Sequence, residues 1–193
     1  MVIVGQQDTI SGYDLLLTGD KWIKFTRLDN TFLLSILKNA KATASALIFH
    51  NIEDIAFVDE IFRLAGWRKK DKLFWCTDFT YNQPRMRYQQ KVYVISWYTR
   101  GRVWTFTPLK PPLPFLRFKP FPGFRRNIPH EQSLDLLRIL IKNHSNLDEL
   151  VFDPFADKCI VELAAHAEGR KSICCVETSR QKIKVEESLR RWC

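Results

Sequence analysis

The segment that decides the fold is ELVFDPFADKCIVELAAHAEGRKSICCVE, residues 149–177. The apolar run over 149–152 predicts a strand, and 158–168 has the apolar spacing of a helix that Gly169 would end. A second apolar run over 172–176 predicts another strand, which Glu177 follows directly. An acid about 20 residues after the first turn is typical of α/β proteins that bind the hydroxyl groups of a ribose. Alone the pattern does not define a function, because acids at strand ends are common.

The same alternation of short apolar runs and helical patterns extends through most of the chain, which favours an α/β sheet. Gly66 stands where a glycine that ends a helix is expected. The predicted strands are 14–18, 46–50, 72–75, 91–98, 103–106, 149–152 and 172–176, and the predicted helices are 30–41, 52–65, 133–143, 158–168 and 178–192.

Length and composition exclude several classes of protein. The 193 residues are 46% hydrophobic, enough for a packed core, but no run approaches the roughly 18 apolar residues of a membrane-spanning helix. The N-terminal sequence MVIVGQQDTI has no basic stretch before its short apolar run, so a secretory signal is not expected. Thirty Lys and Arg against 21 Asp and Glu give a net charge of +9, which favours a polyanionic partner.

The cysteines and histidines predict neither disulfides nor a structural metal. There are five cysteines, an odd number, with no C-x-x-C pair, and the four histidines do not have the spacing of zinc ligands. We therefore expect buried thiols in a reducing, intracellular compartment, either the cytoplasm or the nucleus or nucleoid.

The residues of segment 149–177 are more specific than its pattern. Asp153-Pro154-Phe155-Ala156, then Gly169-Arg170-Lys171 and finally Glu177 stand in the order and spacing found in DNA amino-methyltransferases, which modify the exocyclic amine of adenine or cytosine. Residues 13–18 are similar to the strand that precedes that family's Asp-Pro-Pro-Tyr catalytic turn. The catalytic turn comes first in the chain and the cofactor turn comes last, which is the permuted, β-type order of that family's motifs.

This resemblance implies a three-layer α/β sandwich of the S-adenosylmethionine-dependent methyltransferase type. The sheet would be mostly parallel, with one antiparallel strand near an edge, and residues 1–193 would form a single domain. S-adenosylmethionine would lie at the carboxyl ends of the strands, where the resemblance places Asp153, Phe155, Ala156 and Glu177. A solvated strand end or a helix-capping acid is the alternative role for Glu177.

The catalytic turn departs from the family. The aligned residues are Gly19-Asp20-Lys21-Trp22, so glycine replaces the acid and both prolines are absent. Trp22 could still stack on a base, and Asp20 could accept a proton of the amine only if the turn shifts by one residue. Lys21 would place a cation near the positive methylsulfonium, which is unfavourable. An ordinary surface turn is the alternative interpretation.

The cofactor turn departs as well. Asp157-Lys158-Cys159-Ile160 replaces the family's Gly-Ser-Gly-Thr, and glycines there allow close approach and unusual φ values. Asp157 would repel the carboxylate of the methionine moiety, and Lys158 could partly compensate by pairing with it. We expect the groove to be empty or partly filled by Asp157, Lys158 and Cys159.

Because both turns have changed within a persisting framework, the sequence predicts a pseudo-methyltransferase without catalysis. No cofactor is expected, and S-adenosylmethionine is the cofactor if binding or activity is retained. The alternative is an active DNA amino-methyltransferase in which other residues compensate.

A proline-rich segment over 107–129 interrupts the α/β pattern. Proline fixes φ and removes a backbone donor, so the segment predicts a stiff loop rather than a helix or central strand. Its phenylalanines could stack on unpaired bases or could instead pack back onto the core. The candidate nucleic-acid-binding residues are Arg85, Arg87, Lys110, Arg117, Lys119, Arg125 and Arg126.

Two kinds of partner follow from these features. Nucleic acid, DNA in the first place, is expected because clustered cations neutralise phosphates. The second kind is a protein, either another subunit of the methyltransferase fold or a second copy of this chain, because a stiff segment loses little entropy on docking. No membrane association is expected.

Overall fold

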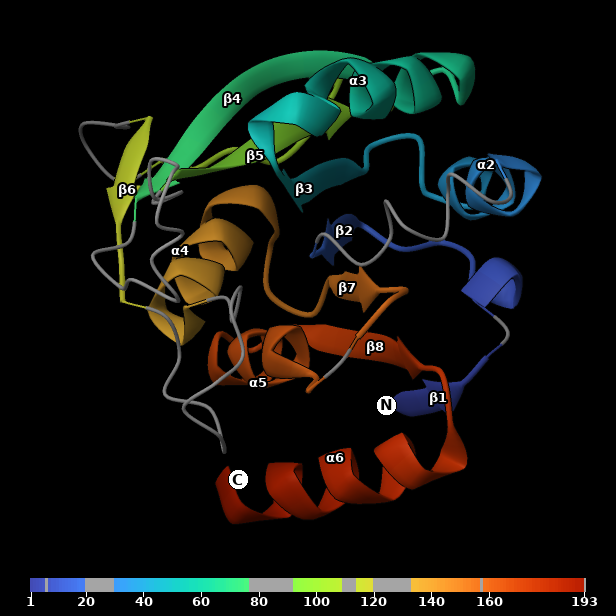
Figure 1. The fold of residues 1–193 in the computed structure, drawn as a ribbon, viewed down its shortest axis with the longest axis vertical. Helices are drawn as coiled ribbons and strands as arrows, with labels where there is room; N and C mark the ends of the chain where they lie inside the picture. Colours follow the sequence, from blue (N-terminus) through green and yellow to red (C-terminus); the bar gives the residue numbers. More distant parts are fainter. Residues whose placement is uncertain are drawn as a thin grey trace, which may run out of the picture.

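The computed structural model describes residues 1–5, 7–19, 30–76, 92–108, 114–119, 133–156 and 158–192. Their strands form one eight-stranded sheet in the order β1-β8-β7-β2-β3-β5-β4-β6 (Figure 1). The strands are β1 (Val2–Val4), β2 (Leu15–Thr18), β3 (Ser45–His50), β4 (Arg68–Cys76), β5 (Val92–Thr99), β6 (Phe115–Arg117), β7 (Leu150–Asp153) and β8 (Lys171–Val176).

One described strand, β5, runs against the others. It pairs antiparallel with both β3 and β4, while the other described pairings are parallel. The strand order places β5 third from the β6 edge of the sheet. The predicted mostly parallel sheet with one antiparallel strand near an edge is therefore confirmed.

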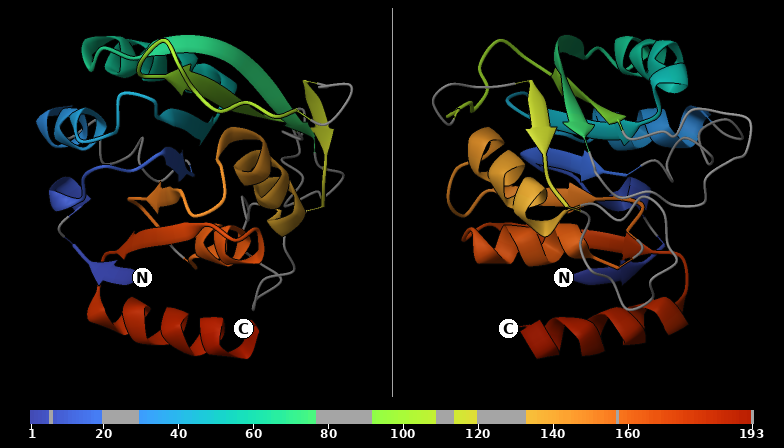
Figure 2. Two further views of the ribbon diagram at one scale, coloured as in Figure 1. Left: turned by 180° about the vertical axis from the view of Figure 1, so that it is seen from behind. Right: turned by 60° about the vertical axis from the view of Figure 1, so that its left-hand side comes forward.

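Helices cover both faces of the sheet (Figures 1 and 2). On one face lie α2 (Asn30–Lys38) and α3 (Ile55–Leu64). They pack against every second side chain of the strands, such as Leu16 and Ala46, because side chains alternate between the two faces of a sheet. On the other face α4 (Leu134–His144) and α5 (Ile160–Ala167) pack against Leu15, Leu17 and Leu47. The three-layer α/β sandwich is confirmed.

The remaining described helices lie at the margins. The helix α6 (Ser179–Trp192) lies beside β1 and β8, where its Val185 packs with Val2 and Val176. Two short 3-10 helices, η1 (Gln7–Thr9) and η2 (Ile52–Asp54), precede β2 and α3. Within the described residues, no helix has the length and apolar character required to span a bilayer.

Local signals explain several element ends. Ser133 caps α4, because its Oγ accepts the backbone N–H of Leu136 at 3.4 Å. Gly66 and Gly169 have φ values of +81° and +72°, so each supplies the left-handed residue that ends α3 or α5. The two glycine ends agree with the sequence prediction.

One strand prediction was wrong, and two short strands were not predicted. Residues 103–106 do not form a strand, and the following amide of Thr107 donates to Asn143 O at 2.8 Å, at the end of α4. The unpredicted strands β1 and β6 each have three residues, too few for a clear periodic signal. β6 lies within the proline-rich segment, which is compatible with its place at the sheet edge.

The cysteine prediction also needs correction. Cys159 and Cys174 form a disulfide, although neither the cysteine count nor the spacing indicated one. The two cysteines are 15 residues apart in the sequence, and the fold brings them together by packing the start of α5 against β8. Cys76 and Cys175 are free thiols, and Cys175 is buried as expected.

Candidate cofactor site and basic surface

Three adjacent parallel strands, β2, β7 and β8, bring the predicted site residues to one edge of the sheet. The register pairs Leu16 with Phe152 and Asp153 with Cys174, so the carboxyl ends of the three strands lie at the same level. Gly19, the turn after Asp153 and Glu177 consequently lie along the same edge. Four predicted site residues lie outside the described residues: Asp20, Lys21, Trp22 and Asp157.

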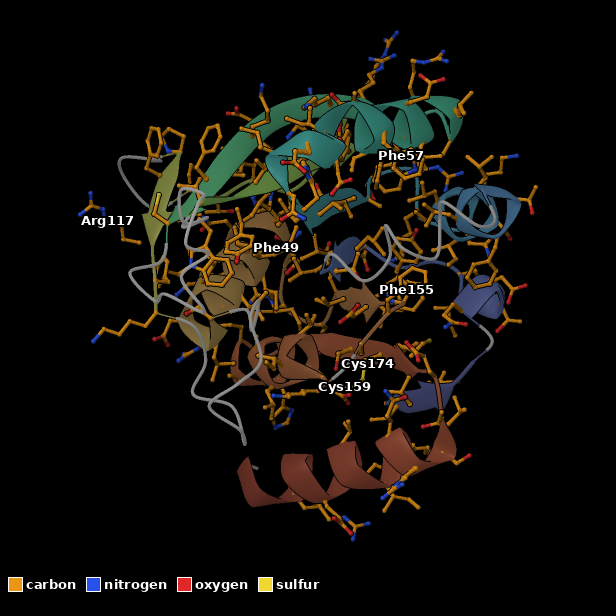
Figure 3. The ribbon with its side chains drawn as sticks, viewed as in Figure 1. Phe49, Phe57, Arg117, Phe155, Cys159 and Cys174 are labelled. Atoms are coloured by element: carbon orange, nitrogen blue, oxygen red, sulfur yellow. A yellow bond between two sulfur atoms is a disulfide. The ribbon has the colours of Figure 1, made fainter. Side chains whose placement is uncertain are left out.

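The turn after β7 is fixed by backbone contacts. The Oδ1 atom of buried Asp153 accepts the N–H of Phe155 at 3.2 Å, and Ala156 donates its N–H to Cys175 O at 2.9 Å. The Phe155 ring packs edge-to-face on Phe32 of α2, with centroids 6.4 Å apart (Figure 3). These contacts give Asp153, Phe155 and Ala156 a structural role that does not depend on a ligand.

Cys159 keeps the left-handed backbone that a glycine would favour. It is the N-cap of α5 with φ 50° and ψ 38°, so replacement of glycine has not removed the unusual φ value. Its side chain is buried with Cys174 and Val185 between β8 and α6. The expectation that Cys159 helps to fill the groove was therefore wrong, because its side chain is committed to this packing layer.

Lys158 lies within the same turn and is partly buried. Burial lowers the pKa of its ammonium group, because the charged form loses hydration. A carboxylate bound beside Lys158 would oppose this shift by favouring the charged form. Pairing of Lys158 with an anionic ligand stays a prediction.

Glu177 begins the connection from β8 to α6, and its carboxylate does not cap the helix. The N–H groups of Glu177 and Thr178 both donate to Oε1 of Gln181, and Gln181 returns its own N–H to Oγ1 of Thr178. Thr178 and Gln181 thus form the capping pair. The Glu177 side chain is exposed and has no hydrogen bond or ion pair among the described residues.

His50 lies at the carboxyl end of β3, the strand that pairs with β2. Its Nδ1 lies 2.7 Å from the carbonyl of Asn51 and its Nε2 lies 2.9 Å from Oγ of Ser96. The carbonyl can only accept, so Nδ1 carries the proton and Nε2 accepts the Ser96 hydroxyl. Burial lowers the pKa of His50, and the neutral ring joins β3 to β5 rather than serving as a base.

The described part of the basic surface lies at the β6 edge of the sheet. Arg117 and Lys119 are exposed there, and their binding of nucleic acid stays a prediction. Leu116 and Phe118 pack into the core on the α4 side, whereas the Phe115 side chain is 63% exposed. Phe118 therefore packs back onto the core, whereas Phe115 stays exposed, and base stacking by Phe115 stays a prediction. The candidates Arg85, Arg87, Lys110, Arg125 and Arg126 lie outside the described residues.

Sequence analysis overlooked the charge on β4. Its first half contains Arg68, Lys70 and Lys72, all exposed, and Lys69 pairs with Asp59 of α3. The run RKKDK is polar, so only the later residues of β4, 72–75, were predicted as a strand. The cations extend the basic surface along the edge beyond β6.

The architecture defines a class: an α/β protein with the fold of S-adenosylmethionine-dependent methyltransferases. No protein-family model and no curated protein sequence matches the chain. Solved structures of DNA amino-methyltransferases share this fold.

The similar structures cover nearly the whole chain. The M1.HpyAVI complex with S-adenosylmethionine superposes with a TM-score of 0.82 and 19% identity over 98% of both chains. PvuII DNA methyltransferase, which is cytosine-N4-specific, gives a TM-score of 0.80 and 12% identity over 99% of this chain and 91% of that one. A putative DNA modification methylase from Thermus thermophilus, complexed with S-adenosyl-L-methionine, gives a TM-score of 0.72 and 15% identity over 99% of this chain and 93% of that one.

Proposed function

We propose that this chain is a DNA methyltransferase-like protein that has lost methyl transfer and acts as a nucleic-acid-binding module or as a non-catalytic subunit. The observation that carries the proposal is Gly19. It directly follows β2, beside the cofactor turn, at the place where the resemblance requires a carboxylate. Without an acceptor there, nothing at that position withdraws a proton from the target amine or holds it near a methyl donor.

The cofactor turn supports weak or absent binding of S-adenosylmethionine. On the adenosine side the residues fit, because Glu177 is free and Cys159 retains the left-handed backbone. On the methionine side Asp157 replaces glycine and adds an acid where the ligand has its own carboxylate. Lys158 offsets part of this repulsion, so the proposal is a vestigial cofactor site.

The alternative is an active enzyme in which Asp20 takes the acceptor role. A transfer assay with S-adenosylmethionine labelled in its methyl group and duplex DNA distinguishes the two. We expect no label in DNA above the background of a protein-free control. Label that enters DNA and disappears in the Asp20→Ala variant would overturn the proposal and establish the enzyme.

The positive charge supports nucleic acid as the partner. With a net charge of +9 and exposed cations along β4 and β6, affinity for DNA should fall steeply as salt rises. A subunit role would instead give a mass that depends on protein concentration. Either role places the protein inside the cell, where DNA is found.

A further inference from the structure

We infer that the outer face of β4 and β6 is a stacking platform for unpaired bases of single-stranded DNA. The inference rests on the proposed nucleic-acid-binding function and names the contact surface and the form of the ligand. The platform consists of Lys72, Phe74, Phe115 and Arg117.

The register of two strands assembles this platform. Phe74 of β4 pairs with Phe115 of β6, and their rings stack at 5.3 Å between centroids with an interplanar angle of 20°. One step further along, Cys76 pairs with Arg117. Because side chains alternate along a strand, Phe115 and Arg117 share a face of β6, and Phe74 and Lys72 share a face of β4.

The side chains on the opposite face of β6 pack against the core, so the side chains of the platform point outward. Leu116 and Phe118 pack among the side chains of the α4 side, and Nε1 of Trp75 donates to Phe118 O at 2.9 Å. Side chains of one face thus hold the strand while those of the other stay available. Figure 3 shows Arg117 directed away from the body of the molecule.

The helix on the platform side does not reach β6. α3 lies over the first half of β4, where Asp59 binds Lys69 at 2.6 Å, whereas β6 pairs with the last three residues of β4. In Figure 1, α3 ends well before β6, and the side view in Figure 2 agrees. The Phe115 side chain accordingly stays 63% exposed.

The chemistry of the platform selects an unpaired base with its phosphate. Stacked rings bind the flat face of any base, and cations on either side neutralise the backbone. Lys72 and Arg117 make no ion pair with the described acids, and neighbouring Asp71 accepts the backbone N–H of Lys72 at 2.7 Å. A second copy of this chain is disfavoured as the occupant, because it would bring the same charge of +9.

The test measures fluorescence anisotropy of a labelled oligothymidylate with the full chain, alongside a labelled duplex. We expect the single strand to bind more tightly than the duplex. Phe115→Ala should weaken single-strand binding by about 5- to 150-fold, the range of one lost base stack. Phe115→Trp should retain binding, and its added fluorescence should be quenched by the oligonucleotide.

Matched variants separate stacking from charge and folding. Leu147→Ala removes a 69% exposed apolar side chain elsewhere and should leave affinity unchanged. Arg117→Ala should lower the salt dependence by about 0.7 counterions, whereas Arg180→Ala on α6 removes the same charge at the far end of the molecule and should not.

Three outcomes would overturn the inference in distinguishable ways. Equal affinity of Phe115→Ala and the parent chain removes the platform but leaves nucleic-acid binding intact. Tighter binding of duplex than of single strand overturns the choice of unpaired bases. Failure of the parent chain to bind either probe removes the nucleic-acid part of the proposed function together with the platform.

Discussion

At the scale of single residues, Cys159 has a left-handed backbone at a position where the resemblance expects a glycine. Cys159 holds φ 50° while its sulfur bonds to Cys174 and packs behind the turn. A non-glycine residue in this region is strained by about 1 kcal/mol, so neighbouring contacts must offset the strain. The disulfide supplies such a contact, because it joins Cys159, the N-cap of α5, to Cys174 in β8.

Reduction should therefore destabilise the protein. Closing a loop of 15 residues contributes about 3 kcal/mol by restricting the unfolded chain, so reductant should lower the free energy of unfolding by about that amount. Urea titrations with and without dithiothreitol measure the change. Cys174→Ser should abolish the response to reductant and Cys76→Ser should retain it. Equal stability of the parent chain with and without dithiothreitol would show that the disulfide does not stabilise the fold.

His144 provides a second prediction at this scale. The ring is 3% exposed between Trp97 and Phe106, and burial lowers its pKa to about 3. The folded protein keeps His144 neutral, while the unfolded chain binds a proton near its ordinary pKa of about 6.5. Stability is thus complete above about pH 6.5 and falls by about 1 kcal/mol per pH unit below it.

Urea midpoints measured at about pH 7 and about pH 5 test this dependence. His144→Phe keeps a ring but cannot take the proton, so its midpoint should fall less on acidification. His166→Gln replaces an exposed histidine and should behave as the parent chain. An equal acid response in His144→Phe and the parent would show that His144 does not govern it.

At the scale of elements, β4 and β6 mark what local sequence can and cannot predict. The four buried residues of β2 and the capped helix α4 carry their own signals, an apolar run and Ser133 before a helical pattern. β6 carries none, because its strand state depends on pairing with the distant segment that ends at Cys76. The first residues of β4 were missed for a related reason: charged side chains suit an exposed edge but do not resemble a buried strand, so only 72–75 were predicted.

The indole of Trp75 should be the anchor of β6. Trp75→Phe leaves Phe118 O without its donor and opens space for the lost ring, so we expect a loss of about 2 kcal/mol in unfolding free energy. Amide hydrogen exchange should rise selectively in β6. Trp67→Phe loses an equivalent bond to Leu37 O on the other face and serves as the control, with β6 exchange unchanged. Unaltered exchange in Trp75→Phe would argue against the anchor.

At the scale of the whole molecule, the fold and the site were predictable to different depths. The order of Gly19, Asp153 and Glu177 along one sheet edge followed from parallel strands, since their carboxyl ends must share an edge. The role of Cys159 did not follow, because its partner lies on another element and its spacing belongs to no motif. The single-domain organisation over residues 1–193 stays a prediction.

The central claim is that the methyltransferase framework persists without a working cofactor site. Calorimetric titration with S-adenosylmethionine, and separately with S-adenosylhomocysteine, tests it most directly. We predict no binding heat and no thermal shift at millimolar ligand, in the parent chain as in Glu177→Gln. Micromolar binding that Glu177→Gln weakens would contradict the account and show that the turn from Asp157 to Ile160 still forms a cofactor pocket.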